Sequence, residues 1–190
     1  MAVDARAHGD SEGTKIGMGW PERVDIIKWI NRILSWEPNA RIVLHGVSMG
    51  AATVLMASGE DLPESVKAVI ADCGYTSEWD EFQREADTLH IPWFPVLNAT
   101  SVLSKVRDGY DFKQASALAQ VKKSRIPTLF IHGSSDELVP YSMLGELYAA
   151  AACEKEELTV EGAGHALSSS VAPALYWRTV EDFIAKYLDR

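Results

Sequence analysis

The sequence predicts an α/β fold with three layers, α/β/α, around a mostly parallel sheet. Short continuous apolar runs alternate with segments of helical periodicity, which is the pattern of parallel strands covered by helices. A Gly-Val-Ser-Met-Gly turn at positions 46–50 joins one such run to a segment of small residues. The composition, 47% hydrophobic and 24% charged, is that of an ordinary globular protein. No linker or repeat divides residues 1–190, so we expect a single domain.

The first helix is expected over residues 20–37. Ile27, Ile30 and Leu34 recur there at helical spacing, and Pro38 ends the pattern. Further apolar positions widen this stripe, so the helix should pack on a sheet with little of its apolar face left to solvent.

A strand is expected at residues 41–47, where Ile42, Val43 and Leu44 form an apolar run without a polar face. The later segments continue the alternation of βαβ units. They are a helix at 48–58 ended by Gly59, strands at 66–71, 128–132 and 158–160, and helices at 141–152 and 173–188. Residues 76–125 contain no strong strand and are expected to form a short, mainly helical cap inserted in the domain.

Charge and cysteine content narrow the classes of function. The net charge of −9 argues against nucleic acid or an anionic membrane as a partner. Two cysteines are too few for a disulfide framework and lack zinc-site spacing, so neither a metal nor another cofactor is expected. The first residues lack the apolar region of a signal peptide, so a cytoplasmic location is the default expectation.

Ser48 is the leading candidate for a nucleophile. It lies in a glycine-flanked turn between an apolar strand and a small-residue helix, which is the context of a nucleophile elbow. We expect the turn to be so tight that side chains at positions 46 and 50 would clash, and its strain to expose the serine hydroxyl. The helix would point its positive N-terminal end at the reacting centre. The alternative is that Ser48 only caps this helix.

A serine nucleophile requires a base and an acid that orients the base. His165 follows the last strand in a glycine-containing loop and is the best candidate for the base, although a histidine in a loop is often only a surface residue. Asp136 follows the preceding strand and is the best candidate for the acid. The alternatives are that Asp136 only favours a turn, or that the neighbouring Glu137 is the acid. His45 and His132 are interpreted as structural hydrogen-bonding residues.

Together these residues resemble the α/β-hydrolase superfamily, especially its bacterial serine esterase and prolyl-oligopeptidase-like members. The elbow, residues 127–140 and the Gly164-His165 pair match, and residues 4–13 are similar to a loop of the family, with Ala7 in place of a frequent glycine. The resemblance covers essentially the entire chain. It implies that Ser48, Asp136 and His165 form a catalytic triad, and that the backbone N–H of Met49 provides one oxyanion contact.

In that family the loop resembling residues 4–13 follows the fourth strand, so the fold is expected to be N-terminally incomplete. The loop that carries the second oxyanion donor would then be absent, and loss of one donor costs about 10² to 10³ in rate. The apolar strand at 41–47 would form an unprotected sheet edge. We therefore expect either an incomplete hydrolase or a homo-oligomer that pairs through this edge.

The function expected is hydrolysis of carboxylic esters through an acyl-enzyme intermediate, with a small-molecule ester or acyl compound as substrate. A serine peptidase or acyltransferase using the same triad is the alternative, as is a catalytically weak binding module. Tyr75, Trp79 and Trp93 are the candidate substrate-binding residues, because they supply apolar bulk in or near the cap.

Overall fold

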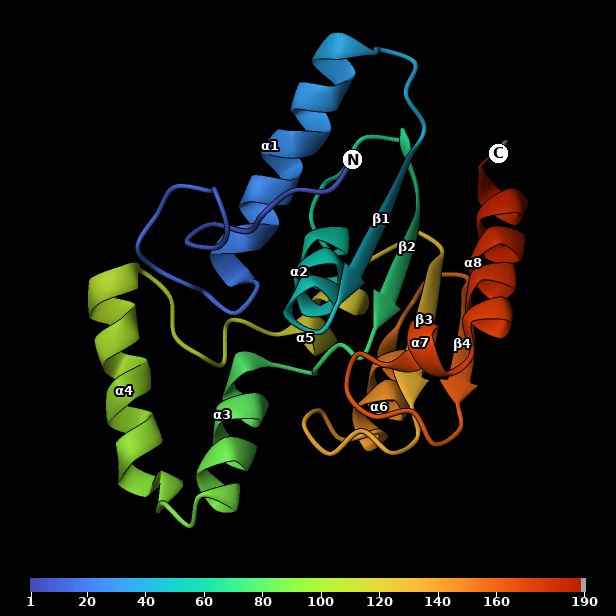
Figure 1. Cartoon of the computed structure of the whole chain (residues 1–190). Helices are drawn as coiled ribbons and strands as arrows, with labels where there is room; N and C mark the ends of the chain where they lie inside the picture. Colours follow the sequence, from blue (N-terminus) through green and yellow to red (C-terminus); the bar gives the residue numbers. More distant parts are fainter. Residues whose placement is uncertain (189–190) are drawn as a thin grey trace.

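A computed structural model describes residues 1–188 and contains one four-stranded sheet. Its strands are β1 (Ile42–Val47), β2 (Val66–Asp72), β3 (Thr128–Gly133) and β4 (Lys155–Val160). They lie in the order β1-β2-β3-β4, and every neighbouring pair is parallel (Figure 1). The predicted parallel sheet is therefore confirmed.

Helices cover both faces of the sheet, which gives the predicted three layers. One face carries α1 (Trp20–Trp36), α2 (Met49–Ser58), α5 (Ala117–Val121) and α6 (Ser142–Ala150), and the other carries α8 (Pro173–Tyr187). Alternate residues of β2 point to opposite faces of the sheet. Val69 and Ala71 belong to the apolar cluster on the face covered by α1, α2, α5 and α6, whereas Ala68 and Ile70 belong to the apolar cluster on the face covered by α8. This alternation follows from the two-residue period of a strand.

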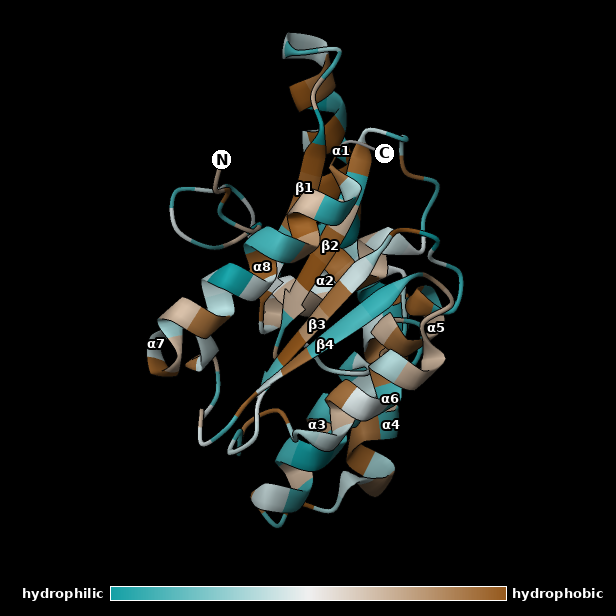
Figure 2. Ribbon diagram, turned by 90° about the vertical axis from the view of Figure 1, so that its right-hand side faces the viewer, coloured by the Kyte–Doolittle hydropathy of each residue, from teal (hydrophilic) through white to brown (hydrophobic). Residues whose placement is uncertain are grey.

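Two elements differ from the prediction. Strand β4 begins at Lys155, three residues earlier than expected, because its first half is polar and therefore gave no apolar signal. Within residues 1–188 it is an edge strand paired only with β3, and its hydrophilic character is visible beside the apolar β1 to β3 in Figure 2. The short helix α7 (Ser168–Val171) precedes α8 and was not predicted, since four residues carry no periodicity.

Strand β1 forms the opposite edge of the sheet. Among residues 1–188 it pairs only with β2. A groove of about 1690 Å³ runs beside it, bounded by α1 and by the N-terminal segment, and reaches Val47, Met49 and Gly50 at the end of the strand. Val47 is 42% exposed there. The apolar edge expected from the sequence is thus present in the described chain.

We expect the chain of residues 1–190 to self-associate through β1, because an apolar strand with unpaired backbone groups is a template for another strand. Lysine in place of Val47 should shift the chain toward monomer with little change in stability, since the side chain is half-exposed. Sedimentation velocity measures this shift. Val106→Lys, at an 81% exposed apolar position on α4, is the matched control and should leave association unchanged. A monomeric parent chain would contradict the prediction.

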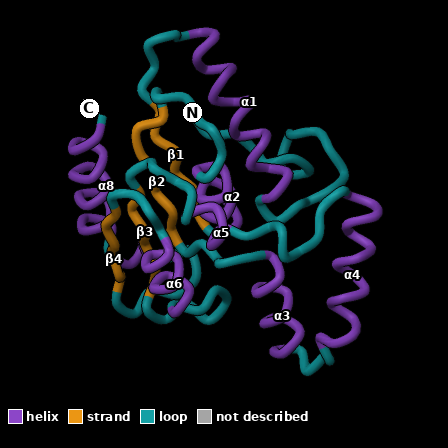
Figure 3. Tube along the Cα trace, turned by 180° about the vertical axis from the view of Figure 1, so that it is seen from behind, coloured by secondary structure: helices purple, strands orange, loops and turns teal. Residues whose placement is uncertain are grey.

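The segment 76–125 contributes a helical hairpin of α3 (Glu78–Thr88) and α4 (Trp93–Asp108), which projects away from the sheet (Figures 1 and 3). Phe82 of α3 packs on Phe112 with ring centroids 4.9 Å apart. Helix α5, at the end of the same segment, lies against α2 in the core layer. None of the helices in the described chain combines the length and apolar character needed to cross a membrane.

Glu78 begins α3 at the base of this hairpin and is only 2% exposed. Its Oε2 atom has no hydrogen-bond partner among the described residues. Burial, followed by the nearby carboxylates of Glu22 and Asp108, raises the pKa of Glu78 to about 8. The folded chain therefore binds a proton at neutral pH that the unfolded chain has already released.

Because Glu78 is buried, the stability of the chain is expected to depend on pH. Because the pKa of Glu78 is higher in the folded than in the unfolded state, the free energy of unfolding should fall as pH rises from about 4.5 to about 8. Glutamine at position 78 should remove this slope and stabilise the chain at pH 9 by on the order of 3 kcal/mol. Urea unfolding at several pH values measures both effects. Glu85→Gln, an exposed position on α3, should leave the slope in place.

Candidate active site

The turn between β1 and α2 holds Ser48 in a strained backbone conformation, with φ 55° and ψ −119°. A Cβ at Gly46 would lie 2.2 Å from the carbonyl oxygen of Gly50, so the predicted need for glycine at 46 is confirmed. The same prediction for Gly50 is wrong, because a Cβ there would meet nothing within 4 Å. Gly50 faces the groove beside β1, which leaves that space open.

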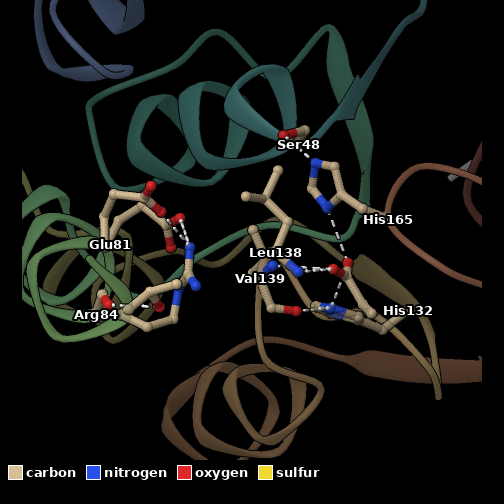
Figure 4. Close-up of polar contacts among 10 residues, drawn as sticks. Ser48, Glu81, Arg84, His132, Leu138, Val139 and His165 are labelled. Atoms are coloured by element: carbon tan, nitrogen blue, oxygen red, sulfur yellow. Dashed lines mark hydrogen bonds and ion pairs between the residues drawn. The ribbon is translucent and has the colours of Figure 1, made fainter. Parts of the chain in front are cut away.

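Ser48 and His165 are joined by a hydrogen bond (Figure 4). The Ser48 Oγ and His165 Nε2 atoms are 2.8 Å apart, and His165 Nδ1 lies 2.9 Å from Asp136 Oδ2. The three side chains come from the C-terminal ends of β1, β3 and β4, which meet at one edge of the parallel sheet. The structure thus brings together the three residues that the sequence singled out, although they are up to 117 positions apart.

The Asp136 carboxylate is fully buried and surrounded by hydrogen-bond donors. Its Oδ1 accepts from the backbone N–H groups of Leu138 and Val139 at 3.0 and 2.9 Å. Its Oδ2 faces His165 Nδ1 and also His132 Nε2, the latter at 3.2 Å. His132 Nε2 lies 3.0 Å from the Val139 carbonyl as well, so its two neighbours are both acceptors and assign the hydrogen to Nε2 (Figure 4).

Glu137, the competing acid in the sequence, is exposed and has no place in this set. His45 bonds to the Tyr176 hydroxyl at 3.0 Å, as expected of a structural histidine. His8 bonds through Nδ1 to the Arg6 carbonyl, and His90 is exposed in the turn between α3 and α4. His165 is therefore the histidine that the described chain offers to Ser48.

Close contact between two loops holds His165 in place. A Cβ at Gly133, where β3 ends, would lie 2.2 Å from the Ala163 carbonyl oxygen. Only glycine at this position therefore lets the loop that carries Asp136 contact the loop that carries His165. The backbone N–H of Ser135 donates to that same carbonyl at 3.0 Å. Ala166, directly after the histidine, has φ 58°, and Cys73, beside the site, has φ 49°. Strained non-glycine residues gather where function requires a fixed geometry.

A second buried carboxylate, Asp72, escaped the sequence analysis. It ends β2 and is 1% exposed. Its carbonyl accepts from the Ser48 N–H at 2.8 Å, and its carboxylate accepts from Ser168 Oγ at 3.1 Å and from the Tyr176 hydroxyl. Asp72 therefore links the elbow to α7, which begins three residues after His165. The signal that could have found it is its position at a strand end, the same signal that found Asp136.

Burial dominates the electrostatics of Asp72 and Cys73. Burial raises the pKa of the Asp72 carboxyl, while Ser168, Tyr176 and the two nearby histidines oppose the rise. Burial, with the adjacent Asp72 charge, raises the pKa of the Cys73 thiol to about 12. At neutral pH Cys73 is thus a neutral thiol and does not compete with Ser48 as a nucleophile.

The three candidate substrate-binding residues lie in different surroundings. Tyr75 is 2% exposed in the core, and its hydroxyl donates to the Met18 carbonyl at 3.0 Å, so burial removes it from the surface that a substrate could touch. Trp79 is partly buried on α3, bonded to Gln83 and covered by Lys113. Trp93 begins α4 at the outer end of the hairpin and is 37% exposed (Figure 1).

A strained serine at a strand–helix turn, with an acid and a histidine at later strand ends of a parallel sheet, defines the α/β-hydrolase class. Comparison with known families agrees and is more specific. Residues 21–190 match the model of the prolyl oligopeptidase family, so the chain belongs to this family.

Three known proteins illustrate the relationship. The Bacillus subtilis protein YqkD is 32% identical over 97% of this chain and 61% of its own length. The Pyrococcus furiosus esterase Pf2001 is 22% identical, with a TM-score of 0.73 over 97% of this chain and 69% of its own. The Pyrococcus horikoshii acylaminoacyl peptidase is 19% identical, with a TM-score of 0.67 over 91% of this chain and 29% of its own. The chain spans about half to three fifths of the length of the curated relatives it matches.

Proposed function

We propose that the chain carries the reacting groups of a serine hydrolase that acts on carboxylic esters through an acyl-enzyme intermediate. The observation that carries the proposal is the continuous hydrogen-bonded series Ser48–His165–Asp136, with distances of 2.8 and 2.9 Å. A serine that merely capped α2 would not require this arrangement, and Ser48 makes no side-chain capping bond.

In this mechanism Ser48 Oγ attacks the acyl carbonyl as His165 Nε2 takes its proton. Asp136 accepts the Nδ1 hydrogen and stabilises the imidazolium without taking the proton. The N–H of Met49, the first residue of α2, has no partner within the helix and is available to the oxyanion. His165 then protonates the leaving alkoxide. Water, activated by the same histidine, releases the carboxylic acid.

Esters are favoured over amides on chemical grounds. An alkoxide can leave a tetrahedral intermediate directly, whereas an amine nitrogen must first be protonated, so ester hydrolysis tolerates weaker oxyanion stabilisation. The esterase Pf2001 shares the fold, as does the acylaminoacyl peptidase, so a peptidase or acyltransferase is the second candidate. A small acyl compound would be the substrate in each case.

A fluorophosphonate probe tests the proposal, because it bonds covalently to an activated serine. We expect the parent chain to label at Ser48, Ser48→Ala to lose the label, and Ser170→Ala, an exposed serine in α7, to retain it. Mass spectrometry of peptides locates the adduct. A parent chain that folds but does not label would instead indicate a binding module.

Turnover then separates the enzymatic alternatives. We expect p-nitrophenyl esters to be hydrolysed faster than the matching aminoacyl p-nitroanilides. Faster anilide cleavage would favour a peptidase. Product esters formed with an added alcohol in preference to free acid would favour an acyltransferase.

A further inference from the structure

Cys73 occupies an unusual position beside Ser48, His165 and Asp136. It directly follows β2, is 0% exposed, and adopts φ 49°, a left-handed conformation that costs an ordinary side chain on the order of 1 kcal/mol. It belongs to neither of the two apolar clusters of the described chain. The backbone N–H of Ala166, the residue after His165, hydrogen-bonds to its thiol. The thiol therefore faces the polar site.

Three potential metal ligands meet at this point. One atom each from Cys73, Asp136 and His165 lies within 4.8 Å of the other two. A thiolate, a carboxylate and an imidazole are all ligands that Zn²⁺ accepts, and three protein ligands with one open position are sufficient for a tetrahedral site. We propose that Cys73, Asp136 and His165 form an inhibitory site for Zn²⁺ and for the related soft cation Cd²⁺.

The spacing indicates a reversible site. With metal bonds of about 2.0 to 2.3 Å, ligand atoms of a tetrahedral zinc site lie about 3.5 Å apart. His165 Nδ1 and Asp136 Oδ2 are 2.9 Å apart, and one ligand atom from each of the three residues lies within 4.8 Å of the others, so the most distant pair has to approach by up to about 1.3 Å. The ion would enter from the side of His165, whose side chain is 20% exposed, whereas that of Asp136 is fully buried.

Coordination would stop the proposed reaction by changing the histidine. In the metal-free site His165 Nδ1 carries the hydrogen and Nε2 accepts the Ser48 proton. A cation that binds Nδ1 leaves the imidazole hydrogen on Nε2, which can then no longer act as a base. A divalent cation also deprotonates a thiol that coordinates it. The balance is one M²⁺ bound, one Cys73 S–H bond broken, one metal–sulfur bond formed and one proton released.

The inhibitory effect rests on the proposed ester hydrolysis and is measured first. Cys153→Ala serves as the parent, because Cys73 is then the sole thiol of the chain. We expect Zn²⁺ to inhibit ester hydrolysis by this parent. Cys73→Ser in the same background should require at least about tenfold more Zn²⁺ for half-inhibition, with each variant compared with its own metal-free rate. Equal sensitivity of the two variants would overturn the site.

Cadmium binding supplies a readout that needs no turnover. In the Cys153→Ala parent, Cd²⁺ should produce a thiolate-to-metal absorption band that saturates at one ion per chain. Ser48→Ala in this background should keep the band, since Ser48 is not a ligand. His165→Gln, at the most exposed of the three ligands, should weaken binding about tenfold or more. A band indifferent to His165→Gln, or no band in a folded parent, would overturn the site.

The two readouts distinguish the failures. A cadmium band without ester turnover would reject the proposed function and keep the metal site. Turnover without a band would keep the function and reject the site. The Cd²⁺ experiment also stands if Cys73→Ser fails to fold, because it uses only the parent, Ser48→Ala and His165→Gln.

Discussion

Asparagine at position 136 is expected to lower kcat for ester hydrolysis about ten-thousandfold, with a measurable loss of stability. Both carboxylate oxygens of Asp136 face hydrogen-bond donors: two backbone N–H groups at Oδ1 and the two histidines at Oδ2. An asparagine has only one acceptor oxygen. If that oxygen stays with the backbone N–H groups of Leu138 and Val139, its NH₂ group faces His165 Nδ1.

That arrangement selects the wrong histidine tautomer. His165 would have to accept at Nδ1, which places its hydrogen on Nε2 and prevents it from taking the Ser48 proton. The opposite amide orientation leaves two backbone donors facing an NH₂ group, at a cost of about 1–3 kcal/mol for each unsatisfied group. Steady-state turnover and urea unfolding measure the two effects. Glu137→Gln makes the same chemical change at an exposed neighbour and should alter neither. A variant within tenfold of the parent would show that Asp136 does not orient the histidine.

The three residues of this series were predictable because each has a local signal. A tight turn after an apolar strand requires glycine and a small residue, and polar residues directly after parallel strands meet at one edge of the sheet. The position of Ser48 is thus encoded by its immediate neighbours. The positions of Asp136 and His165 follow from the alternation of strands and helices.

What could not be predicted depends on distances between elements. Asp72 is the last residue of β2 and Asp136 follows β3, and both are buried, yet only Asp136 meets His165, while Asp72 bonds to Ser168. Which of the two carboxylates meets His165 depends on the conformation of the loop after β4, and no short sequence pattern encodes that conformation. Tyr75 illustrates the same limit, since a residue after a strand end can turn into the core as readily as toward the site.

The two glycines of the elbow should respond to alanine with opposite signs. A Cβ at Gly46 would lie 2.2 Å from the carbonyl oxygen and 2.3 Å from the carbonyl carbon of Gly50, and 2.6 Å from the Ala51 nitrogen. These are backbone atoms of the first turn of α2, so they cannot move aside as a flexible side chain would. We expect Gly46→Ala to lower the free energy of unfolding by about 3 kcal/mol or more. Fluorophosphonate labelling of Ser48 should slow at least about a hundredfold, because the clash displaces the nucleophile.

Gly50→Ala places the same methyl group two residues beyond Ser48, where nothing lies within 4 Å. Gly50 is in α2 and has no positive φ, so alanine should raise the free energy of unfolding by about 0.5 to 1 kcal/mol through its better helix propensity. Urea unfolding of both variants, beside the labelling rate, measures the contrast. A destabilised Gly50→Ala chain would show that position 50 does not tolerate a Cβ and would contradict the prediction.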